Sequence, residues 1–447
     1  MISLWLLLAI VTLYLAWRRR FLLSPTAVFF GYFALVYPIS YLMSYVFEIR
    51  SVFFLRPEEI PSEDVHYALV MVVMGLVSFS VARFLLPVPR IQWKDVRFLP
   101  SRLAGAVLFS LAVAAVSAYT LLKQLGGLDR ILLELGAVRS GELRGLGPQV
   151  YAVTMLVPTV MQFWLMLSLK SGTRNSRPLL ILCIVSSLMG GAFGFRGPVL
   201  ALLIQLVCIC YFLTAKPTRK QILAGVVLLI PVVIFSGVFR ASARAPVWTL
   251  LEEMDPSLPS LLADEAITRV RGVETLVVMT HAVRSGEYHF FADNLSETAL
   301  SVVPSFVIEK GISLPEKITT SVYGEYFVRA GIIKDVFGGV AYSMISEGYW
   351  NLGWLGVVAI SAFAGYILRL IERGAGAGRC AIPQLIVIKA IAGFMPLFIE
   401  APQLGINAIC MNLVINFAVL AFLSWRISSN PLARIRSCGP ELFHWSR

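Results

Sequence analysis

Only one charged side chain, that of Arg196, interrupts the 37 residues at positions 178–214. A helix crosses a bilayer with about 20 apolar residues, so this stretch is long enough for two crossings. Gly194, Gly197 and Pro198 lie near its middle, and glycine and proline interrupt helices. The sequence therefore predicts a hairpin of two membrane helices with Arg196 at the turn.

Uncharged apolar stretches recur along the whole chain. Hydrophobic residues make up 58% of it and charged residues 14%, with a mean hydropathy of +0.79, which excludes an ordinary soluble globular protein. The apolar runs between charged residues predict an all-α integral membrane protein with about eleven transmembrane helices. These are expected near residues 2–17, 21–47, 67–86, 103–122, 151–169, 179–195, 198–214, 222–239, 350–370, 381–400 and 404–425.

The positions of lysine and arginine predict the orientation of these helices, because loops on the cytoplasmic side of a membrane retain basic residues. With the N-terminus outside, the cytoplasmic connections hold 21 of the 38 basic residues, whereas the short outer connections hold 7. We therefore expect a periplasmic N-terminus and a cytoplasmic C-terminus. The net charge of +12 then reflects this orientation and does not indicate nucleic-acid binding.

The predicted spans divide the chain into four parts. Residues 1–239 form a bundle of eight spans, 240–338 a large outer loop with amphipathic helices, 339–425 a re-entrant element with three spans, and 426–447 a cytoplasmic tail. The basic residues in the first half of the outer loop are all arginines, whose guanidinium groups bind phosphate through two hydrogen bonds at once. They are Arg240, Arg244, Arg269, Arg271 and Arg284.

One helix of the outer loop is predicted at residues 262–287. Acidic residues lie in its expected first turn, Arg284 lies in its last turn, and Gly286 follows its end. Val273 and Val277 belong to an apolar face that would lie on the membrane or on the bundle. The alternative is a surface helix whose charges are merely solvated.

Glycines and small polar residues precede the ninth predicted span, in the stretch FGGVAYSMISEGYWNLGWLG at residues 337–356. Backbone irregularity is not tolerated against lipid, so this pattern predicts a broken or re-entrant element that lines a cavity. Glu347 would lie at the mouth of the span, as a general base or a ligand for sugar hydroxyls. The alternative is an interfacial carboxylate paired with a nearby arginine.

The turn of the hairpin at 178–214 also has two interpretations. A charge at the centre of a bilayer costs at least ~2.5 kcal/mol, so Arg196 is expected at an aqueous or protein-lined edge with an anionic partner. It would otherwise be an interfacial anchor whose guanidinium reaches lipid phosphates.

Together these elements resemble the Wzy-type O-antigen polymerases. The shared features are the number of spans, a G-x-R-G turn formed here by Gly194, Arg196 and Gly197, a long outer loop with arginines, and the stretch SEGYWNLGWLG with Glu347 and Asn351. The architecture covers the whole chain, and the specific motifs cover about 40 residues. The resemblance implies a GT-C-like enzyme of the bacterial inner membrane, with a chain-length regulator and a flippase as partners.

The resemblance also implies a reaction and roles for residues. The growing glycan is transferred to a new undecaprenyl-diphosphate-linked oligosaccharide unit at the periplasmic face, and arginines stabilise the departing diphosphate without a metal or cofactor. The sequence has no Asp-x-Asp and no two histidines four residues apart. The diphosphate-binding candidates are Arg196, Arg240, Arg244, Arg269 and Arg271, the catalytic candidates are Glu347 and Arg196, and the candidates for sugar binding or for the base are His281, Glu325, Tyr342, Tyr349 and Asn351.

Three other functions stay open at this point. An O-antigen ligase would carry a histidine where this chain has Tyr342. Another lipid-sugar glycosyltransferase would take its catalytic carboxylate from the acidic segment 48–66, which includes Glu63 and Asp64. A transporter would account for Lys389 inside a span and for prolines inside helices, although Lys389 can also snorkel or pair within the bundle.

Overall fold

The computed structural model of the protein describes residues 2–18, 24–46, 62–96, 100–124, 127, 149, 152–171, 176–189, 196–213, 272–284, 343–375 and 380–424. Every regular element among these residues is helical. In chain order they are α1 (Ile2–Arg18), α2 (Pro25–Ala34), the π-helical turn η1 (Leu35–Ile39), α3 (Ser40–Val46), α4 (Ser62–Phe84), α5 (Pro100–Gln124), the π-helical turn η3 (Ala152–Leu156), α9 (Val157–Ser171), α10 (Ser176–Met189), α11 (Arg196–Leu213), α15 (Gly272–Arg284), α19 (Met344–Glu372), α20 (Ile382–Glu400) and α21 (Pro402–Ser424).

Seven of the described helical segments are long and apolar enough to cross a membrane. They are Pro25–Met43, Ser62–Phe84, Arg102–Gln124, Ala152–Ser171, Met344–Glu372, Ile382–Glu400 and Leu404–Ser424. Three shorter apolar helices, Ile2–Ala16, Arg177–Leu188 and Val199–Leu213, overlap further predicted spans. For the described residues, the prediction of an all-α membrane protein is therefore confirmed. The span predicted at 222–239 lies outside the described residues, so the number eleven stays a prediction.

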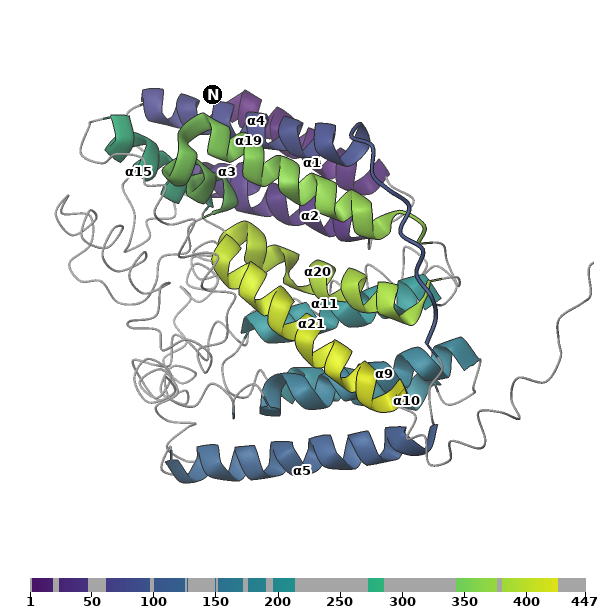
Figure 1. The fold of residues 1–447 in the computed structure, drawn as a ribbon. Helices are drawn as coiled ribbons and strands as arrows, with labels where there is room; N and C mark the ends of the chain where they lie inside the picture. The colour runs from purple at the N-terminus through teal and green to yellow at the C-terminus, as the bar shows by residue number, and fades with distance from the viewer. Residues whose placement is uncertain are drawn as a thin grey trace, which may run out of the picture.

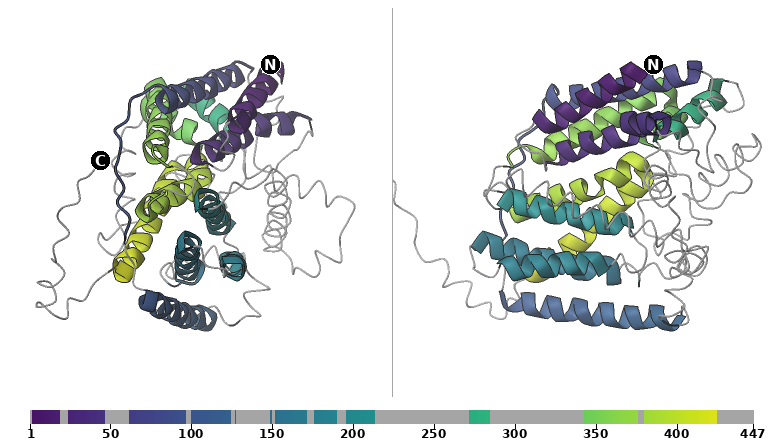
Figure 2. Two further views of the ribbon diagram at one scale, coloured as in Figure 1. Left: turned by 90° about the vertical axis from the view of Figure 1, so that its right-hand side faces the viewer. Right: turned by 180° about the vertical axis from the view of Figure 1, so that it is seen from behind.

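The helices lie side by side in two groups (Figure 1). The first helix group contains α1, α2, α3, α4, α15 and α19, and the second helix group contains α5, α9, α10, α11, α20 and α21. Seen along the helices, the two groups stack one above the other, with α5 at the far edge of the second group (Figure 2). Contacts of α2 and α19 with α20 join the groups, and α19 packs along α4.

Two helices begin more than one helical turn before the position that the sequence predicts. The helix expected from residue 67 begins at Ser62, and the one expected from residue 350 begins at Met344. Each carries a carboxylate in its first turn, Asp64 in α4 and Glu347 in α19. The partial positive charge at a helix N-terminus stabilises such carboxylates. An acidic residue at these two positions therefore belongs to the helix and does not mark its boundary.

Glu372, at the last residue of α19, ties three helices together at one end of the bundle. Its carboxylate accepts hydrogen bonds from the backbone N–H and the hydroxyl of Thr26, each at 2.8 Å, and forms an ion pair with Arg83. Arg83 Nε also donates to the Thr26 hydroxyl at 2.7 Å. Because the groups are largely buried, this network fixes the ends of α2, α4 and α19.

The chain after α4 crosses the same end of the bundle from the first helix group to the second (Figure 1). Asp95, in this connection, forms an ion pair with Lys170 of α9 and accepts a hydrogen bond from the backbone N–H of Ile382 at 3.2 Å. Partial burial acts to raise the pKa of Asp95, but these contacts outweigh it and lower the pKa below its ordinary value. We call this end of the bundle the Asp95 end.

All of the segments at the Asp95 end belong to connections that the basic-residue distribution places on the cytoplasmic side. A cysteine at Ser171, which is exposed at this end, should therefore resist a membrane-impermeant thiol reagent applied from the periplasm. A cysteine at Ser62, exposed at the opposite end, should react. Labelling is compared with the unsubstituted chain, and the reverse pattern would contradict the orientation.

Candidate functional site

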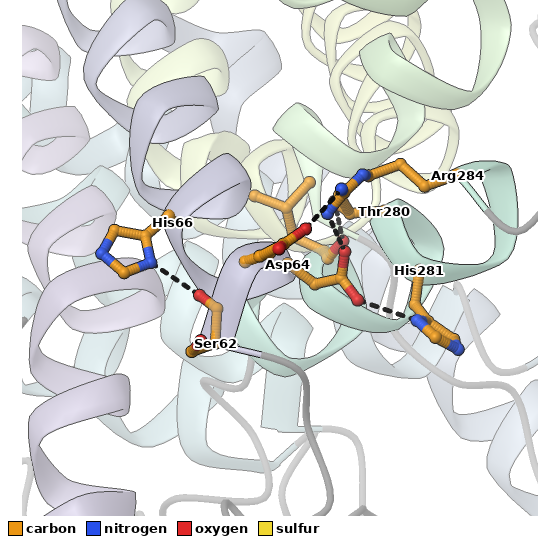
Figure 3. A network of polar contacts seen from close by, with 8 residues as sticks. Ser62, Asp64, His66, Thr280, His281 and Arg284 are labelled. Carbon is orange, nitrogen blue, oxygen red and sulfur yellow. Dashed lines mark hydrogen bonds and ion pairs between the residues drawn. The ribbon is translucent and has the colours of Figure 1, made fainter.

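A network of charged side chains joins α4 to α15 at the opposite end of the bundle, which we call the Asp64 end (Figure 3). Asp64 lies in the first turn of α4, and its side chain is only 3% exposed. Its Oδ1 accepts a hydrogen bond from Arg284 Nη1 at 2.6 Å, and its Oδ2 lies 2.8 Å from His281 Nδ1. Arg284 Nη2 also donates to Glu63 Oε2 at 2.8 Å.

The sequence of α15 explains why His281 and Arg284 reach the same carboxylate. Val273, Leu276 and Val277 are buried against the first helix group, which fixes the rotation of α15. Residues three apart lie on one face of a helix, so His281 and Arg284 project together toward the start of α4. The hydrogen bond that Arg284 donates to Glu63, together with its hydrogen bond to Asp64 and the charge of Asp64, raises the pKa of Arg284 above its ordinary value, which keeps the guanidinium charged.

The contact with Asp64 leaves His281 suited to take up a proton. A carboxylate only accepts hydrogen bonds, so Nδ1 of a neutral His281 ring is the donor and Nε2 carries the free lone pair. The His281 side chain is 44% exposed whereas Asp64 is almost fully buried. A buried carboxylate that orients a half-exposed imidazole is the arrangement by which aspartate supports a histidine general base.

The guanidinium of Arg284 lies over an aromatic ring that leads to two further rings. Its Cζ lies 4.3 Å from the centroid of the Tyr67 ring, a cation–π contact. The Tyr67 ring lies 6.2 Å from that of Trp354, which in turn lies 6.0 Å from the ring of Tyr349. Tyr349 and Trp354 belong to α19, so these rings connect the network of α4 and α15 to the start of α19.

Helix α19 is broken near its beginning, within the stretch in which the sequence predicts a broken element. Ser343 caps its first turn by accepting a hydrogen bond from Ser346 N–H at 3.3 Å. The helix then loses helical geometry at Leu352 and at Gly353, where φ is 61° and ψ is −141°. A positive φ is readily adopted by glycine, which explains the residue at this position. Gly348 and Gly356 are in backbone contact across the break, where a side chain on Gly356 would overlap Gly348.

The short segment before this break carries two buried oxygen atoms that accept no hydrogen bond from any described residue. They are Oε2 of Glu347 and Oδ1 of Asn351, and the two residues are 7% and 4% exposed. The Asn351 amide nitrogen donates to the Glu347 carbonyl at 2.9 Å, which fixes the side chain along the same helix face. Two acceptors without a donor are suited to bind a group that donates hydrogen bonds, such as a hydroxyl.

Four of the predicted site residues lie on α15 and on the first part of α19, two elements that pack against each other and against α4. His281 lies on α15, and Glu347, Tyr349 and Asn351 lie on the first part of α19. Arg196 is the first residue of α11, and its side chain is outside the description. The remaining candidates lie outside the described residues: Arg240, Arg244, Arg269, Arg271, Glu325 and Tyr342.

Some features of the site do not follow from the sequence pattern. Asp64 was predicted only as one of several acidic residues in an outer segment, and its pairing with His281 spans 217 positions. In the sequence, nothing distinguishes Tyr67 and Trp354 from the other residues of the two apolar runs that contain them. Among the residues that the structure describes, no group of three or more His, Cys, Asp and Glu side chains could hold a metal ion.

No protein-family model, curated protein or solved structure matches this chain.

Proposed function

We propose that the protein is a membrane glycosyltransferase that polymerises undecaprenyl-diphosphate-linked oligosaccharide repeat units at the periplasmic face of a bacterial inner membrane. The observation that carries this proposal is the pairing of buried Asp64 with half-exposed His281 at one end of a membrane helix bundle. This pairing supports a general base at an aqueous edge of the membrane, where a lipid-linked substrate would present its headgroup and first sugars.

In the proposed reaction, a hydroxyl at the non-reducing end of a new lipid-linked unit attacks the anomeric carbon of the growing chain. His281 Nε2 takes the hydroxyl proton while Asp64 stabilises the imidazolium that forms. The new glycosidic C–O bond forms, and the bond between the anomeric carbon and the diphosphate oxygen breaks. Undecaprenyl diphosphate leaves with both bonding electrons, and His281 returns its proton to solvent or to the released diphosphate.

The buried acceptors of α19, a helix that packs against α4 and α15, support sugar recognition. Sugar hydroxyls donate hydrogen bonds, and Glu347 Oε2 with Asn351 Oδ1 would receive them. The sequence leaves two roles open for Glu347, a general base or a ligand for sugar hydroxyls. We assign it the binding role, because the half-exposed ring of His281 is oriented by Asp64 and is the better candidate for the base. The break at Gly353 gives the first part of α19 a direction different from that of the rest of the helix.

The departing diphosphate requires positive charge, and Arg196 is our first candidate to supply it. The alternation of helix directions puts the start of α11 at the same end of the bundle as the start of α4. A guanidinium fixed there would stabilise the charge that develops on the leaving group. Arg240, Arg244, Arg269 and Arg271 are further candidates for the same task.

The proposed chemistry needs no divalent metal, because arginines neutralise the leaving group and His281 activates the acceptor. Purified protein given lipid-linked repeat units should elongate them at an unchanged rate in excess chelator. Loss of elongation in chelator with recovery on adding magnesium or manganese would contradict this prediction.

Deletion of the gene tests the proposed function in cells, with the surface glycans separated on a gel. The expected result is lipid A core that carries a single repeat unit and no ladder of longer chains. Undecaprenyl-linked polymer that accumulates at full length without attachment to lipid A core would instead indicate a ligase. Repeat units that stay on the cytoplasmic side would indicate a transporter.

A further inference from the structure

Arg284 is the one member of the five arginines at positions 240–284 whose side chain the structure describes. Its guanidinium donates to two carboxylates of α4 through different nitrogen atoms, to Asp64 from Nη1 at 2.6 Å and to Glu63 from Nη2 at 2.8 Å. One positive charge between two negative charges leaves these three side chains with an excess of negative charge. Such a group repels a diphosphate, so Arg284 requires a role different from the one proposed for Arg196.

Helix periodicity explains why the guanidinium of Arg284 is held in one orientation. Tyr67 lies four residues after Glu63 and three after Asp64, so these three side chains share one face of α4. The Cζ atom of Arg284 lies 4.3 Å from the centroid of the Tyr67 ring, which adds a cation–π contact to two charge-assisted hydrogen bonds. Three side chains of one helix therefore fix the position and the plane of the guanidinium.

The carboxylate of Asp64 divides its two oxygen atoms between the two charged residues of α15 (Figure 3). Oδ1 accepts from Arg284, and Oδ2 lies 2.8 Å from His281 Nδ1. The Asp64 side chain is 3% exposed, so these two contacts, and not solvent, set the direction of the carboxylate. The torsion that turns a carboxylate has broad minima, so a fixed partner on Oδ1 also determines where Oδ2 points.

We infer that Arg284 is a positioning residue for the proposed transfer reaction. It holds Asp64 so that Oδ2 faces His281, and Asp64 in turn holds the imidazole in the tautomer that leaves Nε2 free to accept a proton. Arg284 acts through these two side chains and does not contact the substrate. The inference rests on the proposed role of His281 as the base.

The loss of Arg284 would act on the tautomer of His281 by a definite route. A buried carboxylate without its cation is unfavourable and tends to bind a proton. The O–H of a protonated Asp64 would then donate to Nδ1 of His281, which moves the ring proton to Nε2. In that tautomer the lone pair faces Asp64, and no nitrogen is free to take the hydroxyl proton.

The tautomer can be measured without any substrate, from the nitrogen chemical shifts of isotope-labelled imidazole rings in the purified protein. The signals of His281 are assigned by their loss in His281→Gln, and the spectra are recorded at an alkaline pH that leaves imidazole neutral. We expect a protonated Nδ1 in the unsubstituted protein. Arg284→Met should shift the ring toward the tautomer with a protonated Nε2.

Steady-state elongation of lipid-linked repeat units gives the second measurement. Misplacement of a catalytic group by about 1 Å can cost roughly a hundredfold in rate, so we expect kcat of Arg284→Met to fall by about ten- to a hundredfold. KM for the lipid-linked unit should stay unchanged, because Arg284 does not bind it. A raised KM with normal kcat would overturn the inference, since Arg284 would then contact the substrate.

Arg83→Met is the matched control. Arg83 also forms an ion pair with a carboxylate, that of Glu372, and its Cζ lies 5.6 Å from the centroid of the Phe84 ring, but it belongs to the Asp95 end. Loss of this pair should lower Tm and leave the tautomer of His281 and the kcat of the folded protein unchanged. Equal changes in both variants would indicate general damage and overturn the inference.

Arg284→Lys decides the question if Arg284→Met does not fold. Lysine keeps the charge but lacks the planar pair of donors that spans Asp64 and Glu63, so kcat should lie below that of the unsubstituted protein. Full kcat in this variant would overturn the inference, and so would an unchanged tautomer in a folded Arg284→Met. Absence of elongation by the unsubstituted protein would instead contradict the proposed function, while the tautomer could still be measured.

Discussion

Replacement of His281 by alanine should abolish long glycan chains, with protein levels unchanged. A positioned general base contributes roughly 10²–10⁴-fold to a rate, and at such a loss each chain would stop at its first unit. Asp64→Asn should have a similar effect, because an amide can present its N–H to Nδ1 and so favour the wrong tautomer. The measurement is the glycan ladder of a deletion strain that carries each variant.

His66 provides the matched control for this prediction. It lies on α4 two residues after Asp64 at the same end of the bundle, is exposed, and directs Nδ1 to the Ser62 carbonyl at 2.7 Å (Figure 3). His66→Ala should leave the ladder intact. A normal ladder in His281→Ala would remove the base from the mechanism and return that role to Glu347. Loss of the ladder in all three variants would indicate damage to the fold.

Replacement of Arg196 should have the second large effect. Removal of one preorganised donor to a developing charge costs roughly a hundredfold or more in rate, so Arg196→Ala should leave lipid A core with a single repeat unit. Arg196→Lys should restore little, because lysine supplies charge without the planar pair of donors that holds a diphosphate. The glycan profile on a gel measures both variants.

An interfacial anchor would respond differently, since lysine snorkels to lipid phosphates as well as arginine does. A wild-type ladder in Arg196→Lys would therefore remove Arg196 from the site and move the diphosphate to Arg240 and Arg244. Arg102→Lys is the matched control at the Asp95 end, where Arg102 donates to the Phe422 carbonyl at 3.0 Å. We expect no change in the ladder of that variant.

The helices could be predicted largely from hydropathy, because a segment that crosses a membrane must be both apolar and helical. The starts of α4 and α19 could not, since Asp64 and Glu347 interrupt the apolar pattern but belong to the first helical turn. The glycines at 348, 353 and 356 predict an irregular element, and the structure shows the break at Gly353 with Gly348 against Gly356. Glycine is favoured where the backbone adopts a conformation that other residues disfavour, so this feature can be predicted from the sequence alone.

The candidate site could be predicted only in part. His281, Tyr349 and Asn351 are individually plausible from residue type and position, but the partner that orients His281 is 217 residues away. No local pattern specifies a contact over such a separation, because it depends on how α15 packs against α4. Lys389 of α20 and Gln162 of α9 are 227 residues apart, and for the same reason their sequence positions do not reveal that they form a hydrogen bond.

Elongation by the purified protein tests the central claim most directly. Protein in liposomes is given undecaprenyl-diphosphate-linked repeat units, and the glycan length and the released undecaprenyl diphosphate are measured together. We predict chains of several units with one undecaprenyl diphosphate released for each bond formed, and neither product with His281→Ala. Transport of unchanged repeat units across the bilayer would contradict the account. So would a failure of the well-folded unsubstituted protein and of the well-folded His66→Ala variant to lengthen them.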